Sequence, residues 1–190
     1  MQLTQIAHHK LAKIIQPGDL VVDATIGNGH DTCFLANKVG STGLVIGFDI
    51  QTQAIEKTTL KLKEQTLESR VQLHQISHAC LQSILQPWIG QRRCSAIVFN
   101  LGYLPRGNKN ITTQVASTLQ ALKTGFDLLS KKGCISLLIY TGHPGGQAEA
   151  NAVKAWSKTI PSDLATIEHS FSSNNKTSFP PELLFIRRKK

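Results

Sequence analysis

The sequence predicts an α/β fold: a seven-stranded sheet with helices on both faces and its last strand antiparallel. Short, almost wholly apolar segments alternate with segments of helical period, which is typical of a parallel sheet covered on both faces. Two final strand candidates follow one another without a helix between them, which predicts an antiparallel hairpin. The 190 residues are 41% hydrophobic and contain no apolar run of 18, so we expect one domain over residues 1–190 and no membrane-spanning helix.

The N-terminal half reads as three helix–strand units. Apolar residues from Leu3 to Ile14 recur at helical spacing, and Pro17 with Gly18 ends that helix. Gly40 closes the second helix in the same way. The expected elements are, in order, a helix over 3–14, a strand over 20–22 that ends at Asp23, a helix over 31–39, a strand over 44–48 that ends at Asp49, a helix over 54–64 and a strand over 71–76.

The C-terminal half continues the alternation up to its last two strands. A long helix is expected over 112–129, because apolar residues recur there at the spacing of one helix face. These residues are Val115, Leu119, Leu122, Phe126 and Leu129. The last two strands are joined by a polar stretch over 172–181. The expected elements are a short helix over 80–85, a strand over 96–99, a helix over 112–129, a strand over 134–140, a helix over 147–159 and strands over 164–171 and 183–187.

The charge of the chain favours a polyanionic partner. Twenty-one Lys and Arg residues against twelve Asp and Glu residues give a net charge of +9, which attracts nucleic acid over long distances. A basic soluble protein without such a partner is the alternative. Part of the excess lies in the tail Arg187, Arg188, Lys189 and Lys190, which is either a solvated terminus or a phosphate-binding arm.

The cysteine pattern argues against a metal site. Cys33, Cys80, Cys94 and Cys134 lie far apart without a Cys-x-x-Cys pair, so we expect no zinc and read these residues as buried, reduced thiols. The N-terminus has no basic stretch followed by an apolar segment, so we expect no secretory signal and a cytoplasmic protein.

A glycine-bearing loop follows the first strand and predicts a cofactor site. Gly27 and Gly29 lie between a strand and a helix, where open α/β sheets bind cofactors. Asp49 ends the second strand 20 residues beyond Gly29 and is placed to accept hydrogen bonds from ribose hydroxyls. We therefore expect a cofactor that contains a nucleoside.

The charges around this loop distinguish between cofactors. A dinucleotide fingerprint has a third glycine where this chain has Thr32. Asp23 and Asp31 bracket the loop and would repel a pyrophosphate, whereas S-adenosyl-L-methionine carries a sulfonium and an amino group and no phosphate. The two acids favour the methyl donor, although Asp31 could serve only as a helix cap.

A second polar element ends the fourth strand. The segment from Asn100 through Tyr103 to Pro105 resembles the Asn-Pro-Pro-Tyr element of amino-directed methyltransferases, with Leu101 and Gly102 in place of the prolines. The Asn side-chain oxygen can accept an amine N–H bond and direct the nitrogen lone pair, and Tyr103 can stack on a base. The alternative is a strand-ending Asn and a packed Tyr with structural roles only.

The strand order and these motifs together resemble class-I S-adenosylmethionine-dependent methyltransferases, a Rossmann-like fold, and within them the YtqB-like family once labelled rRNA methylases. The motifs that carry this resemblance are residues 23–32, 48–51, 77–78, 100–105 and 142–146. Members of the family are tRNA methyltransferases that convert 5-aminomethyl-2-thiouridine at the wobble position to its 5-methylaminomethyl form. This chain departs from the family pattern at Arg106 and Asn108.

The resemblance implies roles for matching positions. Asn28 and Asp31 would face the methionine part of the donor, Asp49 and Gln51 its ribose, and Ser77 and His78 its adenine. The implied partner is tRNA, bound through its anticodon stem-loop. Because no separate tRNA-binding domain is visible in the sequence, a homodimer is plausible.

The histidines allow several interpretations. An alkylamine has a pKa of about 10 and must lose a proton before it attacks, and His143 in the glycine-rich segment after the fifth strand is a candidate acceptor. A turn histidine or a phosphate contact explains His143 equally well. We expect His8 and His9 on the first helix to face solvent or tRNA.

Four functions remain open. A methyltransferase for an RNA amine explains the charge, the loop acids and the Asn100 element together. A methyltransferase for another RNA base, such as one in rRNA, shares most of these features. An NAD(P)-dependent oxidoreductase explains only the loop and Asp49, and a noncatalytic RNA-binding module explains only the charge.

Overall fold

The computed structural model describes residues 2–172 and 180–189 and contains one seven-stranded sheet within them. The strand order is β3-β2-β1-β4-β5-β7-β6, and β7 runs antiparallel to both β5 and β6. This topology confirms the predicted fold class. The strands are β1 (Leu20–Asp23), β2 (Leu44–Phe48), β3 (Val71–His74), β4 (Cys94–Leu101), β5 (Cys134–Ile139), β6 (Ala165–Phe171) and β7 (Glu182–Arg188).

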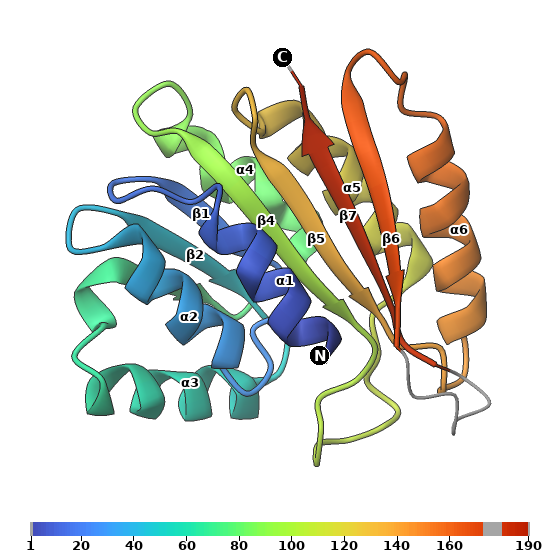
Figure 1. The fold of residues 1–190 in the computed structure, drawn as a ribbon. Helices are drawn as coiled ribbons and strands as arrows, with labels where there is room; N and C mark the ends of the chain where they lie inside the picture. The colour runs from blue at the N-terminus through green and yellow to red at the C-terminus, as the bar shows by residue number, and fades with distance from the viewer. Residues whose placement is uncertain (1, 173–179, 190) are drawn as a thin grey trace.

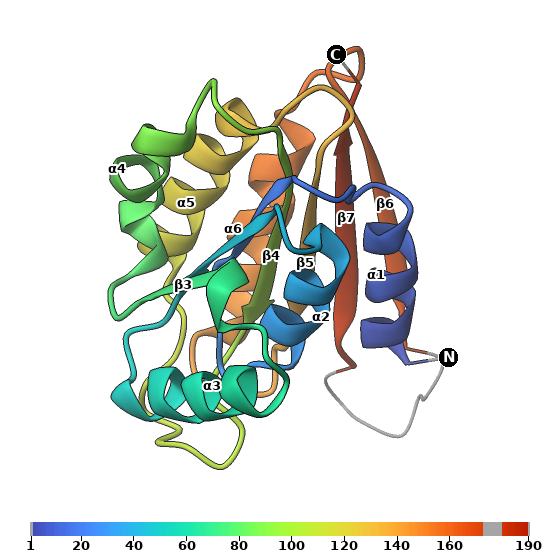
Figure 2. The ribbon, with the colours of Figure 1, turned by 90° about the vertical axis from the view of Figure 1, so that its left-hand side faces the viewer.

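Helices cover both faces of the sheet, as Figures 1 and 2 show. One face carries α1 (Leu3–Ala12), α2 (His30–Val39) and α3 (Thr52–Glu64), and the other carries α4 (Leu81–Leu85), α5 (Val115–Leu128) and α6 (Gly146–Lys158). The parallel strands end at the lower edge in Figure 1, where the loops after β1 and β4 also lie. Open α/β sheets bind their ligands at this edge.

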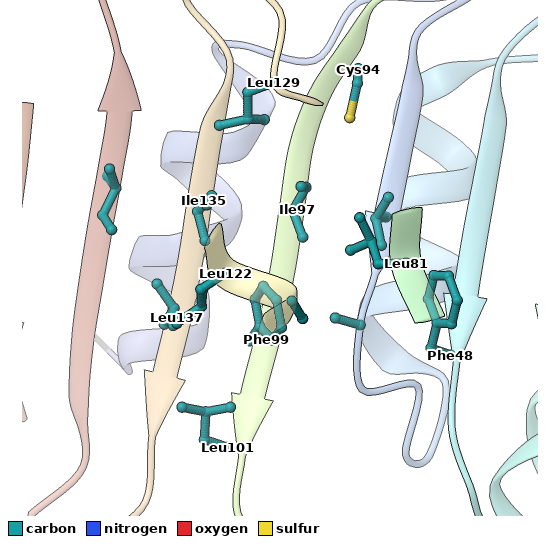
Figure 3. Close-up of a cluster of buried hydrophobic side chains, with 14 of the residues drawn as sticks. Phe48, Leu81, Cys94, Ile97, Phe99, Leu101, Leu122, Leu129, Ile135 and Leu137 are labelled. Carbon is teal, nitrogen blue, oxygen red and sulfur yellow. The ribbon is translucent and has the colours of Figure 1, made fainter. Parts of the chain in front are cut away.

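The core consists of two apolar layers separated by the sheet. Alternate residues of β4 point to opposite faces: Ile97 and Phe99 pack toward α5 (Figure 3), whereas Ala96 and Val98 join the cluster beneath α1 and α2. All four are buried. A strand that is apolar on both faces is held rigidly, and β4 therefore fixes the position of the loop at its carboxyl end.

The longest helix, α5, packs more closely on the sheet than the apolar pattern predicts. Its buried stripe is Thr118, Ala121, Leu122 and Gly125, whereas Val115, Leu119 and Phe126 are only half-buried. A Cβ atom at Gly125 would lie 2.8 Å from Ile97 Cδ1. Small residues thus allow the close approach of helix and sheet, and the larger apolar residues flank the contact.

Several element boundaries differ from the sequence prediction. The central strand β4 extends over Cys94–Leu101 rather than 96–99, because it is paired on both sides and buried along its length. Helix α5 begins at Val115 rather than 112, because Thr112 pairs with Tyr103 in an isolated bridge. Most of the expected join over 172–181 lies outside the described residues.

The basic tail is built into the fold at the edge opposite the loops (Figure 1). Arg187 and Arg188 belong to β7, and Arg188 donates hydrogen bonds to the carbonyl oxygens of Phe126, Asp127 and Leu129. Lys189 Nζ donates to Ser162 O at 2.6 Å, and Lys190 lies outside the described residues. The side chain of Arg188 therefore stabilises the end of α5.

The described part of the chain contains no disulfide and no cluster of side chains suited to a metal ion. Cys33, Cys94 and Cys134 are buried thiols and Cys80 is partly buried, and burial raises the pKa of Cys94 to about 12. None of the helices in residues 2–172 and 180–189 has the length and apolar character to span a membrane.

Candidate active site

Two adjoining cavities lie at the carboxyl edge of the parallel strands. The first has a volume of about 270 Å³ and the second about 600 Å³. The first lies beside the end of β2, and the second lies between the loops after β1, β4 and β5. The lining residues that the two cavities share are Thr25, Gly27, Asn100, Gly102, Tyr103 and Pro105.

Most of the predicted site residues line these cavities. Those in the first cavity are Gly27, Asp49, Gln51, Ser77, His78, Asn100 and Tyr103. Those in the second are Gly27, Asn28, Asp31, Asn100, Tyr103 and His143. Asp23, Gly29 and Thr32 line neither cavity; they lie beneath the loop, where their contacts are with the protein itself.

The glycine loop is fixed from below. Gly29 adopts a left-handed conformation with φ 74° at the start of α2, and a Cβ atom there would lie 2.5 Å from Thr58 Oγ1 on α3. Both the backbone conformation and the space therefore require glycine. Thr32 Oγ1 donates to Asp23 Oδ2 at 2.6 Å, which ties α2 to the end of β1.

Asp23 is a buried carboxyl group that is hard to ionise. Burial and, next, the negative charge of Asp31 raise the pKa of Asp23 to about 7, against the smaller opposite effect of its hydrogen bonds with Thr32 and Thr25. Asp23 is fully buried and lines neither cavity, so the described contacts of its carboxyl group are with the protein. Protonation of Asp23 lowers the negative charge beneath the loop.

Asp49 connects the end of β2 to the glycine loop. Its Oδ2 accepts from the Gly27 amide at 2.9 Å and its Oδ1 accepts from the Gln51 amide at 2.9 Å. Each carboxylate oxygen retains a second lone pair, and the residue lines the first cavity. Asp49 can therefore accept two further hydrogen bonds from a ligand while it holds the loop in place.

Apolar side chains and His78 form part of the wall of the first cavity. Ile50 and Ile76 are 53% and 39% exposed and line the cavity. His78 Nδ1 lies 3.2 Å from Ala24 O, and because a carbonyl oxygen only accepts, Nδ1 carries the hydrogen. Burial lowers the His78 pKa, and its buried Nε2 has no partner among the described residues. Nε2 is thus an unprotonated nitrogen that is closed off from the cavity.

Asn100 occupies the junction of the two cavities. Its backbone N–H donates to Thr25 Oγ1 at 2.7 Å, and its side-chain Nδ2 donates to Asp31 Oδ2 at 2.7 Å. Because Nδ2 is engaged by a carboxylate, the side-chain Oδ1 is the atom left to accept a hydrogen bond from a ligand. Asp31 is held by contacts other than those of a helix cap.

The turn after Asn100 is rigid although it lacks the two prolines of the related element. The Gly102 amide donates to Thr113 Oγ1 at 2.9 Å, and Thr113 Oγ1 donates to Glu149 Oε2 at 2.6 Å. Glu149 is buried and accepts a second hydrogen bond of 2.6 Å from Thr118 Oγ1. Hydrogen bonds to the Glu149 side chain on α6 thus hold the turn that two proline rings hold in the related element.

The second cavity carries positive charge and an aromatic ring. Arg106 and Lys109 line it, and Lys109 Nζ lies 6.0 Å from the centre of the Tyr103 ring. Tyr103 is 36% exposed, and its ring meets the His143 ring edge-on, with centroids 5.9 Å apart. This arrangement suits a planar base with a phosphate nearby.

His143 lies in a turn, whereas His8 contacts the protein rather than facing solvent. His143 Nδ1 lies 3.0 Å from Pro144 O, and its Nε2 is buried against Gly146, so the lone pair of this candidate proton acceptor is packed against backbone. His8, which the sequence places toward solvent or tRNA, contacts Asp31 Oδ1 through Nε2 at 2.5 Å. Its neighbours Ala7 and Leu11 are buried, a signal that this face of α1 packs inward.

Comparison with known proteins agrees with this geometry. Residues 45–187 match the family described as "Putative rRNA methylase". A chloroplastic tRNA (mnm(5)s(2)U34)-methyltransferase of Arabidopsis thaliana is 40% identical over 167 residues, which are 83% of this chain and 60% of the plant protein. The chain thus spans less than two thirds of that relative's length.

Two solved structures cover almost the whole chain. A "putative rRNA-methylase" from Clostridium thermocellum has a TM-score of 0.90 and 36% identity over 99% of this chain and 98% of its own. A "putative methyltransferase" from Streptococcus mutans, solved in complex with SAH, has a TM-score of 0.85 and 30% identity over the same shares. The chain belongs to the rRNA methylase family, whose fold is that of class-I methyltransferases.

Proposed function

We propose that this chain is an S-adenosylmethionine-dependent N-methyltransferase that converts the 5-aminomethyl group of wobble uridine in tRNA to 5-methylaminomethyl-(2-thio)uridine. The observation that carries the proposal is the position of Asn100, whose Oδ1 is an available acceptor where a cavity for a nucleoside meets a basic cavity. The name of the plant relative and the SAH bound to the Streptococcus mutans protein support it.

The first cavity fits S-adenosylmethionine. Asp49 has free lone pairs for two ribose hydroxyls, and Ile50 and Ile76 provide apolar surface for the adenine ring. We place the adenine beside Ser77 and His78, which line this cavity. We assign the methionine end to Asn28 and Asp31, which line the adjoining cavity and present oxygen atoms to its amino group.

The chain's own residues orient the reacting nitrogen. S-adenosylmethionine supplies, when bound, an electrophilic methyl group on a sulfonium. Asn100 Oδ1 accepts an N–H bond of the substrate amine, so that the lone pair points across the junction toward the first cavity. Asp31 stabilises the positive charge that develops on the nitrogen, while Arg106 and Lys109 favour the neutral, nucleophilic amine before attack.

The second cavity accepts the nucleotide in this proposal. Tyr103 stacks on the uracil ring, and Arg106 and Lys109 bind neighbouring phosphates. We also propose His143 as a substrate contact through its ring edge rather than through its buried Nε2. The net charge of +9 draws the anticodon stem-loop to this face.

Replacing Asp49 tests the donor site. We expect Asp49→Ala to weaken S-adenosylmethionine binding by about 1.5 to 3 kcal/mol, because hydrogen bonds between a carboxylate and hydroxyls are lost. Asp49→Asn keeps one acceptor oxygen and should fall between wild type and Asp49→Ala. Titration calorimetry measures both, with thermal unfolding as the control for folding. Unchanged affinity in a folded Asp49→Ala variant would remove this residue from the site.

Salt dependence tests the RNA face. The logarithm of the association constant for tRNA should fall linearly with the logarithm of salt concentration, with a slope on the order of several units. Arg106→Ala and Lys109→Ala should each reduce the slope by about one unit. Lys189→Ala is the matched control, because Lys189 follows the end of β7 that pairs with the amino end of β5, at the opposite edge of the sheet. A slope that responds equally to all three changes would contradict the assigned face.

Nucleoside analysis distinguishes this substrate from another RNA base. Deletion of the protein should remove 5-methylaminomethyl-(2-thio)uridine from tRNA and leave its 5-aminomethyl precursor. Mass spectrometry of digested tRNA and rRNA measures both classes at once. Loss of a methylated rRNA base, with wobble uridine unchanged, would favour the rRNA alternative.

A further inference from the structure

We infer that His8 is a positioning residue for methyl transfer: through Asp31 it holds the Asn100 side chain with Oδ1 toward the reacting amine. This inference rests on the proposed function of the site. The contacts that carry it run from α1 through α2 to the end of β4, and they join residues that are far apart in the sequence.

The two carboxylate oxygens of Asp31 contact different partners. Its Oδ1 lies 2.5 Å from His8 Nε2, and its Oδ2 accepts from Asn100 Nδ2 at 2.7 Å. Burial opposes ionisation of Asp31, but the hydrogen bonds from His8 and Asn100 outweigh it and lower the Asp31 pKa. Asp31 is therefore a carboxylate that only accepts, so His8 Nε2 must carry the hydrogen between them.

The imidazole of His8 is itself held in one plane. It stacks on Phe34 of α2 with a centroid distance of 3.8 Å and an interplanar angle of 1°. The Asp31 side chain is 11% exposed and that of His8 29%, so solvent competes little for the contact. The stack fixes the direction of the Nε2–H bond, and this direction selects the rotamer of Asp31.

Asp31 determines which end of the Asn100 amide faces the cavities. An amide that rotates by 180° would present its NH₂ group, a donor, where the amine requires an acceptor. The carboxylate at 2.7 Å excludes the rotated form because two acceptors would then face each other. His8 does not line either cavity, so it acts on the substrate only through Asp31 and Asn100.

The exposed neighbour His9 provides a matched control, because it belongs to the same helix and contributes to neither cavity. In the donor-free protein, the Asn100 side-chain amide signals, assigned by their loss in Asn100→Ala, should be protected from hydrogen exchange in wild type and His9→Ala. Protection should be lost in His8→Ala. It should return in His8→Gln, whose Nε2 also donates a hydrogen.

Single-turnover rates at saturating donor and RNA give the second readout. His8→Ala should slow transfer about 10-fold to 100-fold, because a misplaced catalytic group costs this much, while donor and tRNA affinities stay within about twofold. In an Asn100→Ala background, the His8→Ala change should lower the rate by less than about twofold, because both changes break one chain of contacts.

The outcomes separate this inference from the proposed function. Three outcomes would overturn the positioning role. The first is full protection of the Asn100 amide in His8→Ala, and the second is no rescue by His8→Gln. The third is that His8→Ala slows transfer as much in the Asn100→Ala background as in the wild type. If wild-type protein transfers no methyl group to RNA with a 5-aminomethyl uridine, the proposed function fails. The exchange measurement still decides the role of His8 in that case.

Discussion

Asn100→Ala is expected to lower the rate of methyl transfer by about 10²-fold or more, which corresponds to about 2.7 kcal/mol of transition-state stabilisation. In the proposed reaction the residue accepts one N–H bond of an amine that is otherwise held through its nucleotide, so its removal should affect the reacting geometry more than binding. Affinities for tRNA and donor should stay nearly unchanged. Single-turnover kinetics beside direct binding measurements would show this separation.

The contacts of Asn100 define the controls for this prediction. Its backbone amide bonds to Thr25 Oγ1 at 2.7 Å, and this bond survives in the alanine variant. The turn that follows is held independently by Thr113 and Glu149. A folded Asn100→Ala variant that transfers methyl at the normal rate would show that Asn100 is structural, and the amine-directed proposal would give way to methylation of another RNA group.

Asp23→Asn is expected to change how stability depends on pH. The pKa of Asp23 is raised from 3.8 to about 7 in the folded chain, so between these values the native state holds a proton that the unfolded state has lost. The contribution of Asp23 to the free energy of unfolding of the wild type is fully present below pH 3.8 and is lost as the pH rises to about 7. The full loss amounts to roughly 4 kcal/mol.

The asparagine variant lacks this titration. The free energy of unfolding of Asp23→Asn, relative to wild type, should therefore increase by about 3 kcal/mol between pH 5 and pH 8. Urea denaturation across this range measures the difference, in which contributions of groups common to both proteins cancel. If the free energy of unfolding changed with pH by the same amount in both proteins, the raised pKa of the buried Asp23 carboxyl group would be contradicted.

The sequence predicts those parts of the site that depend on local patterns. The glycine loop follows an apolar strand, and Asp49 and Asn100 each follow or end another strand. Because parallel strands bring their carboxyl ends to one edge, their order alone brings these residues together. The structure confirms the fold, and it places Asp49 and Asn100 on the walls of the same cavity.

The remaining parts depend on contacts that no local pattern contains. His8 and Asp31 meet only because α1 packs beside α2. Thr113 and Glu149 meet only because the segment before α5 lies beside α6. Gly125 shifts the buried stripe of α5 away from part of the predicted apolar face, because its small size allows the helix to approach Ile97. In each case the packing of whole helices determines the role of the residue.

The most direct test of the proposed function is transfer of a labelled methyl group to matched anticodon stem-loops. One RNA carries 5-aminomethyl-2-thiouridine at the wobble position and the other carries 2-thiouridine. The proposal predicts label only in the first RNA, and mass spectrometry of its digested nucleosides should identify 5-methylaminomethyl-2-thiouridine. Equal labelling of both RNAs, or label on any other nucleoside, would contradict it.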